Sequence, residues 1–441
     1  MTITAPTPPV AVGPPDPGAT APPTSPAALA ARVRAAQGRP TPVRMRSLAA
    51  ALVVVGLLVS ATVGWSFWSA DRALGRADAN AAQLVRLQDL QTRLVRADAD
   101  ATNAFLVGGL EPADQRADYD QAIADATVLV TQAARAQPAD GALLSDLNTA
   151  IVAYTSDVEL ARAANRQGLP VGSQYLRNAS ASLRADALPA LAALIDADAA
   201  RVEAELDNAR NAWGLATAAG LVAIAALVVG SVWLARRTHR YLNGRMFGAG
   251  VVLVVLTIGS TIVLGSVTSQ VTHVRDTDYA GALALAQARL TAYDAKADES
   301  LTLIARGSGG AFEDAWVASA AATVSSLQTA SDAGAVSPTV ALEWDSYAQL
   351  HQEIRALDDG GAWDDAVAAA TDRSEGSANA AFAAFDTSSG DALDRAGEAT
   401  SAGLADAAGG LTLATWLAVL AGLVVAALCW SGISRRIEEY R

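Results

Sequence analysis

Four long stretches without a charged residue constrain this chain more than any other feature. They occupy residues 47–69, 211–235, 247–269 and 411–433. Each exceeds the roughly 20 residues that a helix needs to cross a hydrocarbon core of about 30 Å. Uncharged helices of this length are rare inside soluble proteins. We therefore expect four transmembrane helices in an all-α membrane protein.

The arginines predict how these spans are oriented. They gather in three segments that adjoin the spans, namely 1–46, 236–246 and 434–441. Such positive flanks stay on the cytoplasmic side. Both termini are thus expected in the cytoplasm of a multi-pass plasma-membrane protein, with the long segments 70–210 and 270–410 outside. The charges agree, because the first long segment holds 20 acidic and 13 basic residues and the second holds 22 and 7.

Each long segment is expected to form an extracytoplasmic domain that resembles a four-helix bundle. Neither shows the alternation of a strand, and Ala, Leu, Arg and Gln favour helices. Proline residues and glycine pairs mark the breaks. The first and last helices would continue into spans, as in an up-down-up-down bundle. The expected helices are 71–108, 112–136, 139–166 and 172–210 in the first segment, and 270–306, 310–332, 338–358 and 361–406 in the second.

The two halves resemble each other, which predicts an internal duplication. With a shift of 196 residues, segment 87–101 falls on 283–297, and seven of the fifteen positions are identical. In both halves, polar residues interrupt an apolar seam at matching positions. They would form either a polar layer that fixes the helix register or a layer for binding and switching. These residues are Gln91, Asp98, Gln287 and Asp294.

The most distinctive stretch of the first outer segment is 161–180. Gly168 and Pro170 break the helix there, and polar side chains flank the break. Counted from the membrane, this turn belongs to the distal end of the bundle, where a soluble partner would land. The candidate partner-binding residues are Asn165, Arg166, Gln167, Tyr175 and Arg177.

The sequence contains no recognisable catalytic or metal-binding constellation. The three histidines lie far apart, and the single cysteine, Cys429, lies within a span, so no metal-ligand spacing is present. Phosphate-binding loops and serine-nucleophile motifs are absent. A net charge of −13 argues against nucleic acid, and spans without ionisable residues argue against transport. We expect no enzyme, no cofactor and no metal.

Little of the chain is expected to fold in the cytoplasm. Residues 1–46 begin with a Pro-rich stretch, which predicts a disordered tail that is either a passive extension or a docking strand. The loop 236–246 and the tail 434–441 are short. A signal received outside would therefore have to be passed to a separate protein.

The chain resembles the GlnX family of actinobacterial four-span membrane proteins. The resemblance rests on the span–bundle–span plan of both halves, on NRQGLPVGSQYLR (165–177), on ALDDGGAWDDAVAAAT (356–371) with SANAAFAAFD (377–386), and on the tail RRIEEYR. It implies two partners, the extracytoplasmic binding lipoprotein GlnH, which binds acidic amino acids, and the soluble serine/threonine kinase PknG. The outer segments are also similar to chemoreceptor bundles, which often form homodimers. Whether this chain forms a homodimer or pairs its own halves stays open.

Our leading hypothesis is a non-enzymatic transmembrane sensor and relay. It would recognise an amino-acid-loaded solute-binding lipoprotein, or a ligand directly, and would signal to a cytoplasmic kinase or another effector. The alternative is an envelope scaffold without a small-molecule input, and a transporter component is the third hypothesis. In each case membrane lipid surrounds the spans.

Overall fold

The computed structural model describes residues 41–107, 111–238 and 244–438. The predicted Pro-rich tail lies outside this range except for residues 41–46, as do residues 239–243 of the predicted inner loop and the last three residues of the chain. The described residues form helices, with no strand among them. The predicted all-α membrane fold is confirmed, because four helical units are long and apolar enough to cross a membrane.

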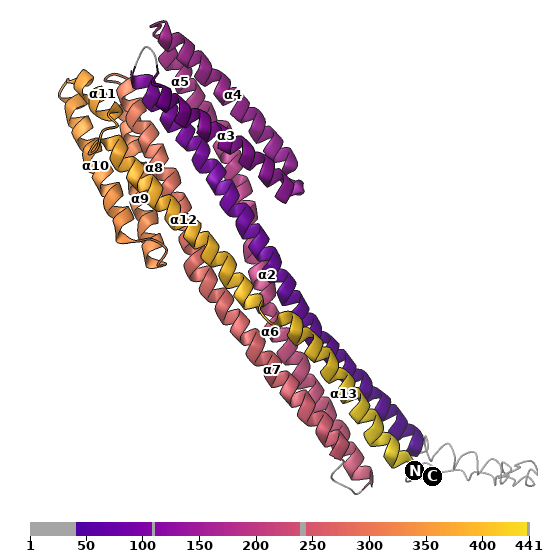
Figure 1. Ribbon diagram of the computed structural model, residues 1–441. Helices are drawn as coiled ribbons and strands as arrows, with labels where there is room; N and C mark the ends of the chain where they lie inside the picture. Colours follow the sequence, from indigo (N-terminus) through magenta and orange to yellow (C-terminus); the bar gives the residue numbers. More distant parts are fainter. Residues whose placement is uncertain (1–40, 108–110, 239–243, 439–441) are drawn as a thin grey trace, which may run out of the picture.

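The apolar stretches occupy one end of these long helices (Figure 1). α2 (Thr41–Val107) has 67 residues, which corresponds to about 100 Å at 1.5 Å per residue. Because this is some three times the thickness of a hydrocarbon core of about 30 Å, only the apolar end can cross a membrane. The other end belongs to the outer bundle. The same holds for α6 (Leu188–Thr238), whereas α7 (Gly244–Val274) and α13 (Leu411–Glu438) are mostly apolar span.

The first outer bundle is built from α2, two middle helices and a kinked return helix. Its core is a seam of leucines from α2, including Leu87 and Leu94, packed against Tyr154 and Leu183. The return helix contains a π-helical turn directly before Pro189, which lacks an N–H and cannot accommodate a regular turn. The helix predicted over 172–210 therefore continues past Pro189 by way of this wider turn. The elements are α3 (Ala113–Ala136), η1 (Pro138–Asp140), α4 (Gly141–Arg166), α5 (Val171–Ser182), η2 (Leu183–Ala187) and α6.

The second outer bundle has an aromatic core, in which Trp344, Tyr347, Phe382 and Phe385 are in mutual ring contact. The helix predicted over 361–406 is interrupted here. Its two parts flank a six-residue loop that ends at Ser377, whose hydroxyl accepts a hydrogen bond from the Ala380 amide and caps the next helix. The elements are η3 (Arg275–Tyr279), α8 (Ala280–Ile304), α9 (Gly310–Asp332), α10 (Pro338–Asp359), α11 (Trp363–Thr371) and α12 (Ala378–Ala408).

The two outer bundles pack against each other. α2 of the first bundle packs along α8 and α12 of the second, as Figure 1 shows. Val95, Ala99 and Leu106 of α2 belong to the same apolar core as Leu285 and Phe382 of the second bundle. The outer helices therefore form one joint assembly, in which α2 and α8 share the centre.

Small residues bring the first and last spans into close contact. A Cβ atom added to Gly422 would lie 2.4 Å from Ser60 Cβ, and one added to Gly56 would lie 2.8 Å from a methyl group of Val425. Rows of small residues are known to permit such close helix packing in membranes. Both glycines therefore face a neighbouring helix.

Candidate functional site

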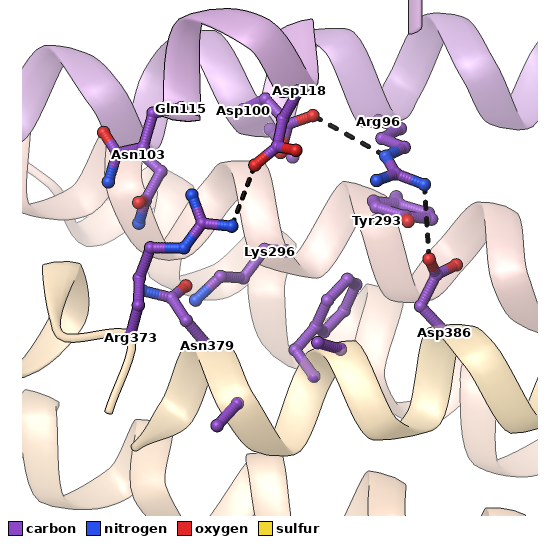
Figure 2. A pocket seen from close by; sticks show the side chains of 14 residues that line it. Arg96, Asp100, Asn103, Gln115, Asp118, Tyr293, Lys296, Arg373, Asn379 and Asp386 are labelled. Carbon is purple, nitrogen blue, oxygen red and sulfur yellow. Dashed lines mark hydrogen bonds and ion pairs between the residues drawn. The ribbon is translucent and has the colours of Figure 1, made fainter. Parts of the chain in front are cut away.

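A polar pocket lies between the two outer bundles, and it is the candidate functional site. Its volume is about 400 Å³, and its walls come from α2, α3, α8, α12 and the loop between α11 and α12. Figure 2 shows these side chains converging from both halves of the chain. A concave site of this size with a few convergent polar groups is typical of small-molecule binding.

Charged side chains of opposite sign line this pocket. On one side, Arg96 lies 3.4 Å from Asp386 and 3.7 Å from Asp100. On the other side, Arg373 donates a hydrogen bond of 2.8 Å to Asp118, with Asp114 as a second partner at 3.2 Å. Both arginines therefore pair with a carboxylate from the opposite half of the chain (Figure 2).

Two acceptor atoms in the pocket have no hydrogen-bond partner. They are Oδ2 of Asp100 and Oε1 of Gln115, and both atoms are buried. Gln115 as a whole is 6% exposed. Burial raises the pKa of Asp100 to about 7, although Arg96 opposes the shift. Buried acceptors of this kind normally have a donor, so the pocket has unused capacity for one.

The only lysine of the chain, Lys296, lies at the inner wall of the pocket. Its ammonium group donates a hydrogen bond of 2.6 Å to Glu299, which also lies 2.9 Å from His351 Nδ1 and accepts from Tyr347. Burial alone would raise the pKa of Glu299, but Lys296 and His351 lower it to about 2. The carboxylate thus stays ionised and fixes the position of the lysine.

A second polar cluster joins the bundles around Arg184, which lies in the π-helical turn η2. Arg184 donates a hydrogen bond of 2.9 Å to Asp298 and lies within 3.8 Å of both Asp98 and Asp294. Asp98 also accepts hydrogen bonds from Ser180 and Tyr154. One arginine therefore faces three carboxylates that come from both halves.

Burial raises the pKa values of the carboxyl groups in this Arg184 cluster. The pKa of Asp294 rises to about 7 and that of Asp298 to about 6, while that of Asp98 is also raised. In each case Arg184 opposes the effect of burial without cancelling it. Perturbed carboxyl groups in a buried cluster are common at functional sites, although structural networks show them too.

The predicted polar layers behave differently from one another. Asp98 and Asp294, which were expected at equivalent heights of two bundles, lie close together because both contact Arg184. Gln91 is half-buried and Gln287 is exposed. The two glutamines are thus not part of the cluster, and they do not form matching layers.

The predicted tip residues lie at the end of the bundle away from the spans (Figure 1). A groove of about 640 Å³ lies there, lined by the end of α2, the turn between α4 and α5, and α11. Asn165 lines the groove and donates a hydrogen bond to the carbonyl of Phe105. The other four are not among the residues that line the groove: Arg166, Gln167 and Tyr175 are exposed, and Arg177 is half-buried and donates a hydrogen bond to Gln174.

Sequence reasoning missed most residues of the pocket. Arg373 lies in the loop that interrupts the helix predicted over 361–406. The sequence from Asp372 to Ser377 is rich in turn-forming residues and could have indicated this loop. In the folded loop, Asp372 accepts hydrogen bonds from the amide and hydroxyl of Ser374. Nothing in the sequence indicated that Arg96 and Asp386, 290 positions apart, would meet.

Comparison with known proteins adds one finding. Residues 73–207 match the family model of the actinobacterial sensor domain. The match supports an actinobacterial sensor protein and covers the first outer bundle, including Asp98, Asp100 and Arg184. No curated protein and no solved structure matches the chain. The more specific resemblance to the GlnX family, with its partners, stays a prediction, as does the internal duplication.

Proposed function

We propose that this protein is a non-enzymatic transmembrane sensor and relay. It recognises a ligand or an amino-acid-loaded solute-binding lipoprotein outside the cell, and it passes the signal to a cytoplasmic partner such as a serine/threonine kinase. The sensor-domain match of residues 73–207 supports a sensing role. The arginine-rich flanks of the spans support the orientation, with both termini in the cytoplasm.

One observation carries the relay. α2 contributes Arg96, Asp98 and Asp100 to the two polar clusters, and it continues as a single helix from Val107 to Thr41. Asp98 lies 29 residues beyond the end of the first predicted span, which is about 44 Å along the helix axis. A rearrangement between the bundles is therefore mechanically connected to the first span, because packed helices shift as units of about 1–2 Å.

The groove at the tip supports the proposed partner. Its lining includes the exposed apolar side chain of Leu169, and the exposed residues Arg166, Gln167 and Val171 are close to Leu169 in the chain. A mixed apolar and polar surface of this kind suits a transient protein interface. A binding protein that occupied it would contact both bundles, because the groove also includes Arg306 and Trp363.

Spin-label distances across the spans test the proposal. Cysteines replace Ser47 of α2 and Phe247 of α7, both exposed at the inner ends of the spans, in a Cys429→Ser background. We expect the distance between the two labels to shift by about 1–2 Å when loaded binding protein is added to full-length protein in nanodiscs. A control pair at Ser47 and Leu58, both on α2, should not shift.

The same experiment separates the sensor from the alternative. An envelope scaffold would bind its partner with or without amino acid, and its labelled spans would keep their distances. Ligand-independent binding together with unchanged distances would therefore contradict the relay.

A further inference from the structure

The pocket between the bundles contains equal numbers of cations and carboxylates. The cations are Arg96, Lys296 and Arg373, and Asp100, Asp118 and Asp386 are the carboxylates. A ligand with a single charge would meet as many like charges as opposite ones. A neutral apolar ligand would leave charged groups desolvated without compensation. The charge composition therefore favours a ligand that carries both signs.

The unpartnered acceptors fix where the positive group of such a ligand would lie. Gln115 Oε1 and Asp100 Oδ2 are buried, accept no hydrogen bond, and belong to the α2–α3 wall of the pocket, although Arg96 Nε lies 3.7 Å from Asp100 Oδ2. Two acceptors, one of them a carboxylate, match the N–H donors of a primary ammonium group. A quaternary ammonium group has no N–H and would leave both acceptors unsatisfied.

The opposite wall supplies the donors for a carboxylate. Figure 2 shows the ammonium end of Lys296 directed toward Arg373 and Asn379. Lys296 has three N–H donors, and Glu299 accepts a hydrogen bond from it. Arg373 has a forked guanidinium group, and Asp114 and Asp118 occupy part of it. The rings of Tyr293 on α8 and Phe382 on α12 also line the pocket and offer apolar surface to a carbon skeleton.

We propose that this pocket binds a small zwitterion with a primary ammonium and a carboxylate group, of the α-amino acid class. The ammonium pole contacts Asp100 and Gln115, and the carboxylate pole contacts Lys296 and Arg373. The inference rests on the proposed sensor function, and it assigns direct ligand recognition to the joint assembly. Because the two poles contact opposite halves of the chain, a bound ligand would hold the bundles in one relative position.

Calorimetry on full-length protein in nanodiscs tests the ligand class. The twenty L-amino acids are titrated one by one, together with two matched fragments of each that binds. For L-alanine these are propionate, which lacks the ammonium group, and ethylamine, which lacks the carboxylate. We expect at least one amino acid to bind, with both fragments at least tenfold weaker.

Two variants and one control locate the site. Gln115→Leu removes an acceptor that has no partner, and Arg373→Gln removes a partly exposed cation, so both variants should fold. Each should weaken amino-acid binding at least tenfold. Asp120→Asn should leave binding unchanged, because this exposed carboxylate pairs with Arg116 away from the pocket.

The results distinguish the ligand class from the relay. The ligand class is overturned if no amino acid binds at millimolar concentration, or if propionate or ethylamine binds as tightly as alanine. It is also overturned if Gln115→Leu and Arg373→Gln both bind like the unaltered chain. Amino-acid binding without a spin-label shift would instead contradict the relay and leave the ligand class intact. If the binding protein alone shifts the spin-label distance and calorimetry detects no amino-acid binding, the proposed ligand class is contradicted and the relay is supported.

Discussion

The Arg184 cluster makes a quantitative prediction about pH and stability. Three carboxylates face one arginine, and Asp98 is 1% exposed. Burial raises the pKa of Asp294 from its ordinary 3.8 to about 7, with Arg184 opposing and Asp298 and Asp98 adding to the shift. The folded protein therefore binds more protons at Asp294 than the unfolded chain does between about pH 4 and pH 7. In this window the contribution of Asp294 to the free energy of unfolding decreases as the pH rises.

The substitution Asp294→Asn isolates this effect. Asparagine resembles the protonated carboxyl group, so the variant avoids the cost of a buried charge. A shift of about three pKa units corresponds to at most about 4 kcal/mol. Because the Asp294 side chain is 27% exposed and shares its arginine with two other carboxylates, we expect about half of this limit. The variant should be about 2 kcal/mol more stable than the unaltered chain at pH 8, and nearly equal to it at pH 4.

Thermal unfolding of full-length protein in nanodiscs, followed by circular dichroism, measures this difference. The stability difference between variant and unaltered chain should grow from pH 4 to pH 7 and then level off. Asp196→Asn, at an exposed position of α6, is the matched control and should show no such trend. A variant that is less stable than the unaltered chain at pH 8 would refute the reasoning, since the charge of Asp294 would then be a net stabilising partner of Arg184.

Three further changes have expected outcomes. Arg184→Gln leaves three carboxylates without their cation, so it should cost about 3–5 kcal/mol at pH 8 and less at pH 5, in the same unfolding measurement. Gly422→Val should destabilise the chain by about 1–3 kcal/mol through overpacking, whereas Gly214→Val, where a Cβ meets nothing within 4 Å, should cost less; equal effects would contradict the close contact of the first and last spans. In a variant without the native cysteine, Ser156→Cys should react with a membrane-impermeant maleimide in intact cells, and Gly244→Cys should react only after permeabilisation; the reverse pattern would contradict the proposed orientation.

The spans and the helical class could be predicted because each depends on local sequence. A long apolar stretch requires a helix in lipid whatever its neighbours are, since no other open structure satisfies its backbone. The helix ends were also marked locally, by Pro112, Pro138 and Pro338. The loop before Ser377 was missed because its turn residues are surrounded by alanine, which extends a helical pattern through it.

The joint assembly could not be predicted, because helical periodicity identifies a buried face but not its partner. The seam of α2 predicted a core within the first bundle, and Leu87 and Leu94 do lie there. Val95 and Ala99, on another face of the same helix, lie in the core of the second bundle. Asp98 was expected to be a polar interruption, and its role depends on Arg184 and Asp298, which no spacing rule connects to it.

The charge balance of the two halves explains why their interface is polar. Both outer segments are acidic, so bringing them together creates repulsion that the contact must offset. Arginines of each half do this by pairing with carboxylates of the other: Arg96 with Asp386, Arg184 with Asp298, Arg275 with Glu203, and Arg373 with Asp118.

In an interface held by ion pairs, water or a charged ligand can take the place of one partner, which is not the case in an apolar interface. Exposed pairs contribute only about 0–1 kcal/mol each, and water or a charged ligand can replace either partner. In a close-packed apolar core, neither water nor a charged ligand can replace a side chain, so the packed helices resist displacement. The joint assembly combines both kinds of contact: apolar side chains around Ala99 hold α2 against α8, and the ion pairs around the pocket can exchange partners. A ligand with two charged poles, as proposed for the pocket, would exchange partners with these ion pairs, while the shared apolar core keeps α2 against α8.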